Sequence, residues 1–255
     1  MMPKLLTGTL CLSAMISFTS ASHAASAKIQ VDPTQVGIVG GVLAASVDPI
    51  TAVTVKLLFI NGKHTMGCTG TLISPNYILT AAHCVAGITG GAATFADGSV
   101  STDIYQPVTN PNFNNTVGTN RFDFALIKFE KAVPVTDFAQ LATTQTEPQN
   151  GQPASIAGFG VTTPTGKDFQ FLRTLPVQIL NLSFSNAEVE ISEGVTSGAC
   201  HGDSGGPGYI EQNNSVIVWG VDALNAPVAT ADCLGTELYS RVSVVSDWIQ
   251  QVIKQ

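Results

Sequence analysis

Residues 196–208 read TSGACHGDSGGPG, and this stretch decides how the rest of the chain is interpreted. Within it, Gly202-Asp203-Ser204-Gly205-Gly206 fits the G-x-S-x-G pattern, in which a nucleophilic serine is exposed on a tight turn. A serine hydroxyl is a poor nucleophile at neutral pH, so it needs a base to take its proton and an acid to orient that base. The positions of the histidines therefore decide which class of hydrolase the pattern fits.

The chain has four histidines, and all of them precede Ser204. This excludes an α/β-hydrolase, because that class follows the order serine, acid, histidine. His23 lies in the N-terminal segment, and His64 lies in a hairpin-turn sequence where an exposed position is expected. His201, three residues before the serine, is expected on a loop or pocket rim. His83 remains as the candidate base.

The composition describes an acidic globular chain. Its 255 residues are 44% hydrophobic and only 11% charged, which is too apolar for a disordered chain and long enough for a large core. The net charge is −7 and the 11 Lys and Arg residues are scattered, so neither nucleic acid nor an anionic membrane surface is expected as a partner. No Cys-x-x-Cys or His-Glu-x-x-His spacing occurs, so no metal site is expected.

The N-terminus predicts an export signal. Lys4 supplies the positive charge, and residues 5–18 are apolar apart from a glycine and small hydroxyl residues. Small residues suited to cleavage end at Ala24 or Ala27. The apolar run is too short for a membrane span, and no later stretch reaches the required length. We expect residues 1–27 to be a signal peptide cleaved after one of these alanines, and the protein to be secreted or periplasmic.

Export also gives the cysteines a role. Cys11 is lost with the signal, and four cysteines remain, which are Cys68, Cys84, Cys200 and Cys233. An even number of cysteines in an exported chain predicts two disulfides. Four cysteines allow three pairings, and this count does not choose among them.

Short β-like runs separated by Gly, Pro and Asn dominate the chain. The candidate strands are residues 52–60, 67–73, 124–129, 154–159, 174–182, 215–221 and 237–242. Many short strands favour antiparallel barrels or sandwiches. From Val244 an apolar stripe predicts a docking helix, with Ser243 as its N-cap. Residues 143–152, rich in Thr, Gln, Pro and Gly, are expected to connect two halves.

Four motifs resemble, in order, the signatures of the chymotrypsin/trypsin family of serine proteases. They are IVGG at 38–41, TAAHC at 80–84, DFALI at 123–127 and GDSGGP at 202–207. Trp219-Gly220, Tyr239-x-Arg241-Val242 and the C-terminal helix extend the resemblance to the end of the chain. The family implies an all-β fold of two antiparallel β-barrels with a C-terminal helix, and an active site in the cleft between the barrels.

The resemblance also implies the catalytic roles. His83 would be the general base, Asp123 would orient it, and Ser204 would be the nucleophile, with the backbone N–H groups of Gly202 and Ser204 as the oxyanion hole. This chemistry needs no metal or organic cofactor. The expected protein is a monomeric serine endopeptidase acting on peptides or proteins, with a proteinaceous inhibitor as a further partner. Two alternatives stay open: a catalytically silent relative that binds partners, and an esterase with the same mechanism.

The family resemblance implies the disulfide pairing and an activation step. Cys68 would pair with Cys84, Cys200 would pair with Cys233, and the absence of other family bridges suggests a reduced, bacterial version. Cleavage before Ile38 would free an amine that pairs with Asp203, so residues 28–37 are expected to be an activation peptide and 38–255 the protease domain. Gly37 departs from the family pattern, because a trypsin-type activator needs Lys or Arg there. A different protease, or autocatalysis, is expected to cut.

The specificity pocket departs from trypsin as well. Gly198 stands at its base, where trypsin-like enzymes carry an aspartate, and Glu237 stands where the family usually has a glycine on the wall. Glu237 would pair with a basic substrate side chain, fill the pocket in favour of small ones, or point outward into solvent. Val218 replaces a serine often found before the substrate-binding Trp219-Gly220. These five residues are the expected pocket, and the preferred side chain stays open.

Overall fold

Two sheets, antiparallel apart from one parallel pair in the second, carry the fold, as seen in a computed structural model. All of the residues that it describes belong to the unit Pro33–Gln255. They are residues 38–102, 104–116, 120–133, 135–167, 169–225 and 233–254. The expected signal peptide and activation peptide, residues 1–37, lie outside this description.

The first sheet has seven strands in the order β6-β5-β2-β3-β4-β8-β7. Its strands are β2 (Thr54–Asn61), β3 (His64–Ser74), β4 (Tyr77–Thr80), β5 (Gly90–Thr94), β6 (Val100–Ser101), β7 (Ile104–Thr109) and β8 (Ala125–Phe129). The two-residue period of β2 shows how the core forms, because Val55, Leu57 and Phe59 alternate inward and are fully buried. A tight turn at Gly62 (φ 59°) joins β2 to β3 and leaves His64 exposed, as expected.

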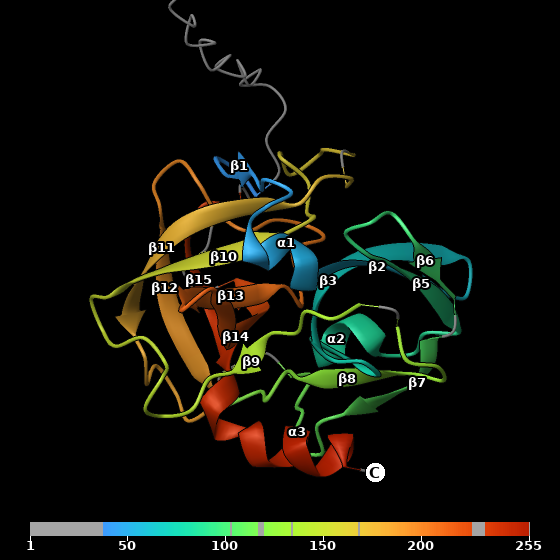
Figure 1. Cartoon of the computed structure of the whole chain (residues 1–255). Helices are drawn as coiled ribbons and strands as arrows, with labels where there is room; N and C mark the ends of the chain where they lie inside the picture. The colour runs from blue at the N-terminus through green and yellow to red at the C-terminus, as the bar shows by residue number, and fades with distance from the viewer. Residues whose placement is uncertain are drawn as a thin grey trace, which may run out of the picture. The chain divides into compact units, whose positions relative to one another are not determined.

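The second sheet follows the order β1-β11-β10-β13-β14-β15-β12, with β9 paired to β14. Its strands are β1 (Val42–Leu43), β9 (Gln140–Leu141), β10 (Pro153–Gly158), β11 (Arg173–Asn181), β12 (Glu188–Gly194), β13 (Pro207–Gln212), β14 (Ser215–Asn225) and β15 (Gly235–Arg241). Pairing of β11 with β12 closes this sheet into a barrel, whereas the first sheet is an open half-barrel. The two groups of strands stand side by side in Figure 1. The expected all-β class and C-terminal helix are confirmed.

Helices are few and short: α1 (Pro49–Val53), α2 (Ala82–Val85), the 3₁₀ turn η1 (Val242–Val244) and α3 (Ser246–Ile253). The expected docking of the C-terminal helix is confirmed, because Ile249 and Val252 belong to the core of the first sheet. The Tyr77 hydroxyl on β4 also donates to the Val252 carbonyl at 3.2 Å. Figure 1 shows α3 in red at the foot of both sheets.

Two local expectations were wrong. Ser243 does not cap α3, whose N-cap is Val245, because the Ser243 hydroxyl donates instead to the Glu147 carboxylate at 2.6 Å. Residues 143–152 do not connect the two halves, because they join β9 to β10, and both strands belong to the second sheet. The crossing between the sheets lies earlier, between β8 and β9.

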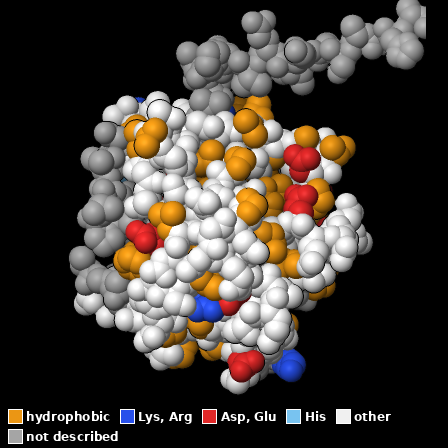
Figure 2. Space-filling view, turned by 90° about the vertical axis from the view of Figure 1, so that its left-hand side faces the viewer, with side chains coloured by type: hydrophobic (Ala, Val, Ile, Leu, Met, Phe, Trp, Pro, Cys, Tyr) orange, Lys and Arg blue, Asp and Glu red, His pale blue; other side chains and the backbone are white. Residues whose placement is uncertain are grey.

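The seven expected strands correspond to β2, β3, β8, β10, β11, β14 and β15, with ends that differ by a few residues. Within the described ranges, no helix is long and apolar enough to cross a membrane. The face shown in Figure 2 carries scattered hydrophobic side chains and few charged ones, in keeping with a chain that is only 11% charged.

Candidate active site

His83 and Asp123 meet because the strands beside them are neighbours. β4 pairs antiparallel with β8, with Thr80 opposite Ala125, so α2 at the end of β4 lies next to the residues that enter β8. The Nδ1 atom of His83 is 2.7 Å from Oδ2 of Asp123, and the His83 backbone N–H donates to Oδ1 at 2.9 Å. Both carboxylate oxygens therefore hold the same histidine, one through its ring and one through its backbone.

The burial of Asp123 would be costly without these bonds. Its side chain has no exposed surface, whereas the His83 side chain is 24% exposed. Arg121 adds a positive charge, with Nη2 at 4.0 Å from Oδ2 of Asp123. An acid that is buried and bonded in this way fixes the ring orientation of the histidine and favours the tautomer with a proton on Nδ1.

The approach to Asp123 is fixed from the second sheet. Glu188 on β12 accepts the backbone N–H groups of Asn120 at 2.7 Å and Arg121 at 2.6 Å. The Ser185 hydroxyl also donates to the same carboxylate. The sequence analysis did not identify Glu188, because its contact with Arg121 spans 67 residues and no local sequence pattern indicates it.

Ser204 lies in a turn that is tied to the first sheet through Thr69 of β3. The Thr69 backbone N–H donates to the Ser204 carbonyl at 2.9 Å, and its hydroxyl donates to the Gly202 carbonyl at 2.8 Å. Gly202 (φ 101°) and Gly205 (φ 81°) both adopt the left-handed backbone region that favours glycine. The glycines of the G-x-S-x-G stretch thus permit the turn that presents the serine.

A cavity of about 410 Å³ contains His83, Gly202 and Ser204 in its lining. His201 lies on its rim and is exposed, as expected. Phe169 is an unexpected member, and its ring packs against the α-carbons of Gly67 and Gly202, where an added Cβ would come within 2.7 Å of it. The serine, the histidine and the glycine N–H group proposed for an oxyanion therefore share one cleft.

Both disulfides are formed with the pairing that the family resemblance implied, Cys68–Cys84 and Cys200–Cys233. The first bridge lies beside the candidate base, because Sγ of Cys84 is 3.7 Å from Nε2 of His83. The second lies behind Gly198, whose α-carbon packs against the Cys233 carbonyl. The first bridge therefore lines the cleft through Cys68, and the second packs against Val161 and Phe169 of the cleft lining.

The IVGG stretch lies beside the serine turn. Ile38 is fully buried in the core of the second sheet, and Gly198 donates its N–H to the Val39 carbonyl at 2.9 Å. The Asp203 carboxylate accepts the N–H groups of Gly160 at 2.7 Å and Cys200 at 2.8 Å. The IVGG stretch and the Asp203 carboxylate therefore both bond to the loop that contains Gly198.

Four carboxyl groups are buried near this loop, and they are Glu193, Asp203, Asp222 and Glu237, each at most 5% exposed. Burial raises the pKa of Glu193 to about 8, while the Ala199 N–H bond lowers it and the Asp203 charge raises it. Burial, with the charges of neighbouring acids, raises the pKa values of Asp222 and Glu237 well above their ordinary range. No Lys or Arg in the described residues pairs with Glu193, Asp222 or Glu237.

Because Glu237 is buried, the interpretation in which its side chain points outward into solvent is excluded. Sequence reasoning missed Glu193 and Asp222, because their positions depend on the register of β12, β14 and β15. Asp222 lies against the serine turn, where Gly205 donates its N–H to the Asp222 carbonyl at 2.8 Å. Val218 and Trp219 are fully buried in the two cores, and neither they nor Gly198, Gly220 and Glu237 line the cavity of His83 and Ser204.

Comparison with known proteins identifies the class of this chain as the serine endopeptidases. A family model described as Trypsin matches residues 42–249. Brachyurin of Leptuca pugilator is 31% identical over 84% of this chain and 97% of its own length. Chymotrypsin-like elastase family member 1 of Canis lupus familiaris is 26% identical over 88% of this chain and 95% of its own. The chain belongs to the trypsin family.

One solved structure supports the fold independently. The structure of HL collagenase superposes with a TM-score of 0.72 at 20% identity, over 86% of this chain and 99% of that one. At this identity the match supports the arrangement of the strands and says nothing of the substrate.

Proposed function

We propose that this chain hydrolyses peptide bonds through a triad of Ser204, His83 and Asp123. The observation that carries the proposal is the 2.7 Å contact between Nδ1 of His83 and the buried Asp123 carboxylate, in the same cleft as Ser204. Contacts of this kind leave Nε2 as the basic nitrogen that faces the cleft. The same arrangement underlies the general serine-protease template.

The mechanism runs in two halves. Nε2 of His83 takes the proton from Oγ of Ser204 as Oγ attacks the carbonyl carbon, and the N–H groups of Gly202 and Ser204 donate to the developing oxyanion. The imidazolium then gives its proton to the leaving nitrogen, and an acyl-enzyme on Ser204 results. Water, deprotonated by His83, releases the acyl group. Asp123 stays ionised throughout and stabilises the imidazolium.

The pocket expected around Gly198, which would bind the side chain on the acyl side of the scissile bond, is proposed to accept a basic side chain. Gly198 at its base carries no side chain, and Glu193, Asp222 and Glu237 bring buried carboxyl groups to the elements around it. A Lys or Arg side chain supplies the cation that this cluster lacks in the described residues, and a buried carboxylate gains most from such a partner. A preference for small side chains is the competing outcome of the test below.

Export, maturation and cleavage before Ile38 complete the proposal. Two disulfides favour an oxidising compartment outside the cytosol. The burial of Ile38 close to the Gly198 loop supports an N-terminus that organises this loop once residues 28–37 are removed. N-terminal sequencing of the active form should begin at Ile38, and any other start would contradict this step.

The test is a library of internally quenched peptides with all residues before the scissile bond varied, incubated with the matured protein. We expect cleavage after Arg or Lys, no cleavage by Ser204→Ala, and loss of the basic preference in Glu237→Gln with retained cleavage after other residues. Cleavage only after small residues would overturn the basic pocket while leaving the triad intact. No cleavage of any peptide by correctly folded wild type would favour the catalytically silent relative.

A further inference from the structure

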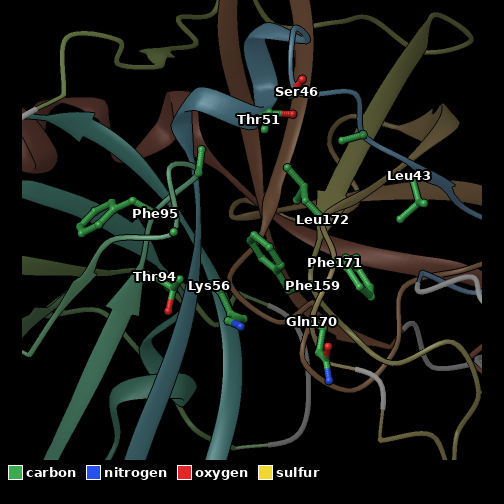
Figure 3. Close-up of a pocket in the computed structure, with 13 residues that line it drawn as sticks. Leu43, Ser46, Thr51, Lys56, Thr94, Phe95, Phe159, Gln170, Phe171 and Leu172 are labelled. Atoms are coloured by element: carbon green, nitrogen blue, oxygen red, sulfur yellow. The ribbon is translucent and has the colours of Figure 1, made fainter.

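A second cavity, of about 390 Å³, opens between β2 and the segment that joins β10 to β11 (Figure 3). We call it the Lys56 pocket and define it by Leu43, Lys56, Phe95, Phe159, Phe171 and Leu172. Most of its lining side chains are apolar, and Lys56 is the one charged residue among them. Nothing in the proposed mechanism uses this cavity.

The apolar surface of the Lys56 pocket is open to solvent. Phe171 is 55% exposed and Leu43 is 45% exposed, whereas Phe95 and Leu172 are buried. The exposed position of Phe171 is held in place, because Arg173 donates to its carbonyl at 3.2 Å and Ala44 donates to the Leu172 carbonyl at 3.0 Å. Exposed apolar side chains around a preformed hollow are typical of a binding site.

Phe169 joins the Lys56 pocket to the active-site cleft. Its ring lines the cleft beside Ser204, and the Lys56 ammonium lies 6.0 Å from the centre of the same ring. A second link runs through Thr69, whose hydroxyl accepts the Phe159 N–H at 3.1 Å and donates to the Gly202 carbonyl at 2.8 Å. The wall of the pocket is therefore bonded to the residue that also holds the oxyanion loop.

The direction of Lys56 follows from strand register. Lys56 on β2 lies directly opposite Thr69 on β3, so the two side chains project from the same face of the sheet. Because Thr69 points to the serine turn, Lys56 points toward the same cleft. No carboxylate among the described residues forms an ion pair with Lys56.

The proposed mechanism determines which half of the substrate lies on the side of Lys56. The leaving nitrogen takes its proton from Nε2 of His83, and this atom lies next to Sγ of Cys84. The Cys68–Cys84 bridge and Gly67 continue the cleft from there to Phe169. In the proposed function the acyl side chain points toward Gly198, which does not line this cavity, so the leaving-group half of the substrate extends toward Lys56.

We propose that the Lys56 pocket binds the substrate chain on the leaving-group side, takes an apolar side chain, and pairs Lys56 with a substrate carboxylate. One cross-strand step of about 5 Å and one hydrogen-bonded step of similar length separate Lys56 from the serine turn. An extended chain covers this in about three residues at about 3.3 Å each. The proposal rests on the proposed function, because it needs a scissile bond at Ser204.

The test compares substrates with one common acyl half. One peptide carries an apolar residue and Glu at the second to fourth positions beyond the scissile bond, a second carries Gln for Glu, and a chromogenic anilide has no leaving chain. We expect kcat/KM for the Glu peptide to exceed that for the Gln peptide by about three- to five-fold, the upper part of the range for a partly exposed ion pair. Lys56→Met should abolish this ratio, Lys56→Arg should keep it, and Lys63→Met, an exposed control, should leave it unchanged.

Each outcome separates this proposal from the proposed function. Hydrolysis of the anilide should be equal in wild type, Lys56→Met and Lys63→Met, and an equal loss on all three substrates in Lys56→Met would overturn the Lys56 pocket. An acid preference that survives Lys56→Met, or none in wild type, would overturn it as well. If nothing is hydrolysed, the proposed function fails. The Lys56 pocket is then tested by fluorescence anisotropy, which measures binding of the labelled Glu-containing leaving-side peptide to Ser204→Ala with and without Lys56→Met. Weaker binding with Lys56→Met supports the pocket, and equal binding contradicts it.

Discussion

Two groups of buried acids, Asp123 beside His83 and the acids behind the serine turn, are held in opposite ways. Next to the first sheet, Asp123 is fully buried, and both of its oxygens are engaged by His83, with Arg121 at 4.0 Å. In and around the second sheet, Glu193, Asp222 and Glu237 are buried together, and no Lys or Arg of the described residues pairs with them. The first site satisfies its carboxylate, whereas at the second site burial, with the charges of neighbouring acids, raises the pKa values of Asp222 and Glu237.

This difference predicts different roles for the two groups of acids: Asp123 holds the candidate base in position, and the other acids take part in substrate recognition. A satisfied buried carboxylate acts as a rigid support, because each oxygen has a fixed partner. A group of buried acids without cations is costly by itself, and it gains stability when protons or a cation arrive. We therefore expect changes on the first side to alter turnover, and changes on the second side to alter substrate choice and pH dependence.

The largest effect should follow from Asp123→Asn. The side chain keeps its size but no longer favours the tautomer with the proton on Nδ1 of His83, so kcat should fall by about 10⁴-fold. Thermal unfolding should show that the fold is retained. The measurement is steady-state hydrolysis of a peptide substrate near pH 8. A loss of less than about ten-fold would show that Asp123 does not orient the base.

The next effect concerns stability and pH. Glu193 keeps its proton in the folded chain up to about pH 8 but ionises near 4.5 when unfolded, so the free energy of unfolding should fall as pH rises through this window. Glu193→Gln removes the ionisable group and keeps an oxygen for the Ala199 N–H. The variant should match wild type near pH 4 and exceed it at pH 8 by on the order of 3 kcal/mol.

Urea unfolding at both pH values measures this difference. Glu211→Gln, at an exposed position on β13, is the matched control and should shift neither curve. If Glu193→Gln lowers stability at pH 8, the carboxylate of Glu193 has a favourable partner, and the contrast between Asp123 and the acids behind the serine turn would be lost.

The smallest effect should follow from Glu188→Gln. Glu188 accepts the backbone N–H groups of Asn120 and Arg121, and a glutamine side chain offers only one oxygen. One buried N–H then loses its partner, which costs about 1–2 kcal/mol of stability. Urea unfolding of Glu188→Gln beside Glu211→Gln measures it, and equal curves would show that the contact does not hold the approach to Asp123.

The sequence predicts most of what is local and motif-bearing. The β-strand periods in residues 52–60 and 174–182 and the apolar stripe after Val244 identified elements that are present. Two short-range inferences failed, because Ser243 finds a better partner in Glu147 and residues 143–152 lie within the second sheet. The preference of a residue for a helix cap, or of a segment for a linker, is a weak local signal, and contacts with residues distant in the sequence easily override it.

The pocket was the hardest part to predict. Glu193 and Asp222 are ordinary acids in the sequence, and only strand register brings them behind the serine turn. Trp219 shows the opposite case. It was expected in the pocket, but it lies on β14, which continues to Asn225, and its side chain is fully buried in the core, with its ring centroid 5.4 Å from that of Tyr239 at an interplanar angle of 44°. The residues proposed for catalysis lie in sequence motifs, whereas the proposed pocket depends on long-range strand pairing.

The most direct test of the central claim is to locate a covalent adduct. The matured protein is treated with a fluorophosphonate, digested, and analysed by mass spectrometry. We predict a single adduct on Oγ of Ser204 in wild type, a rate of labelling that falls in Asp123→Asn, and no adduct in Ser204→Ala. An adduct on another residue, or an unmodified Ser204 in folded wild type, would contradict the assignment of Ser204 as the nucleophile.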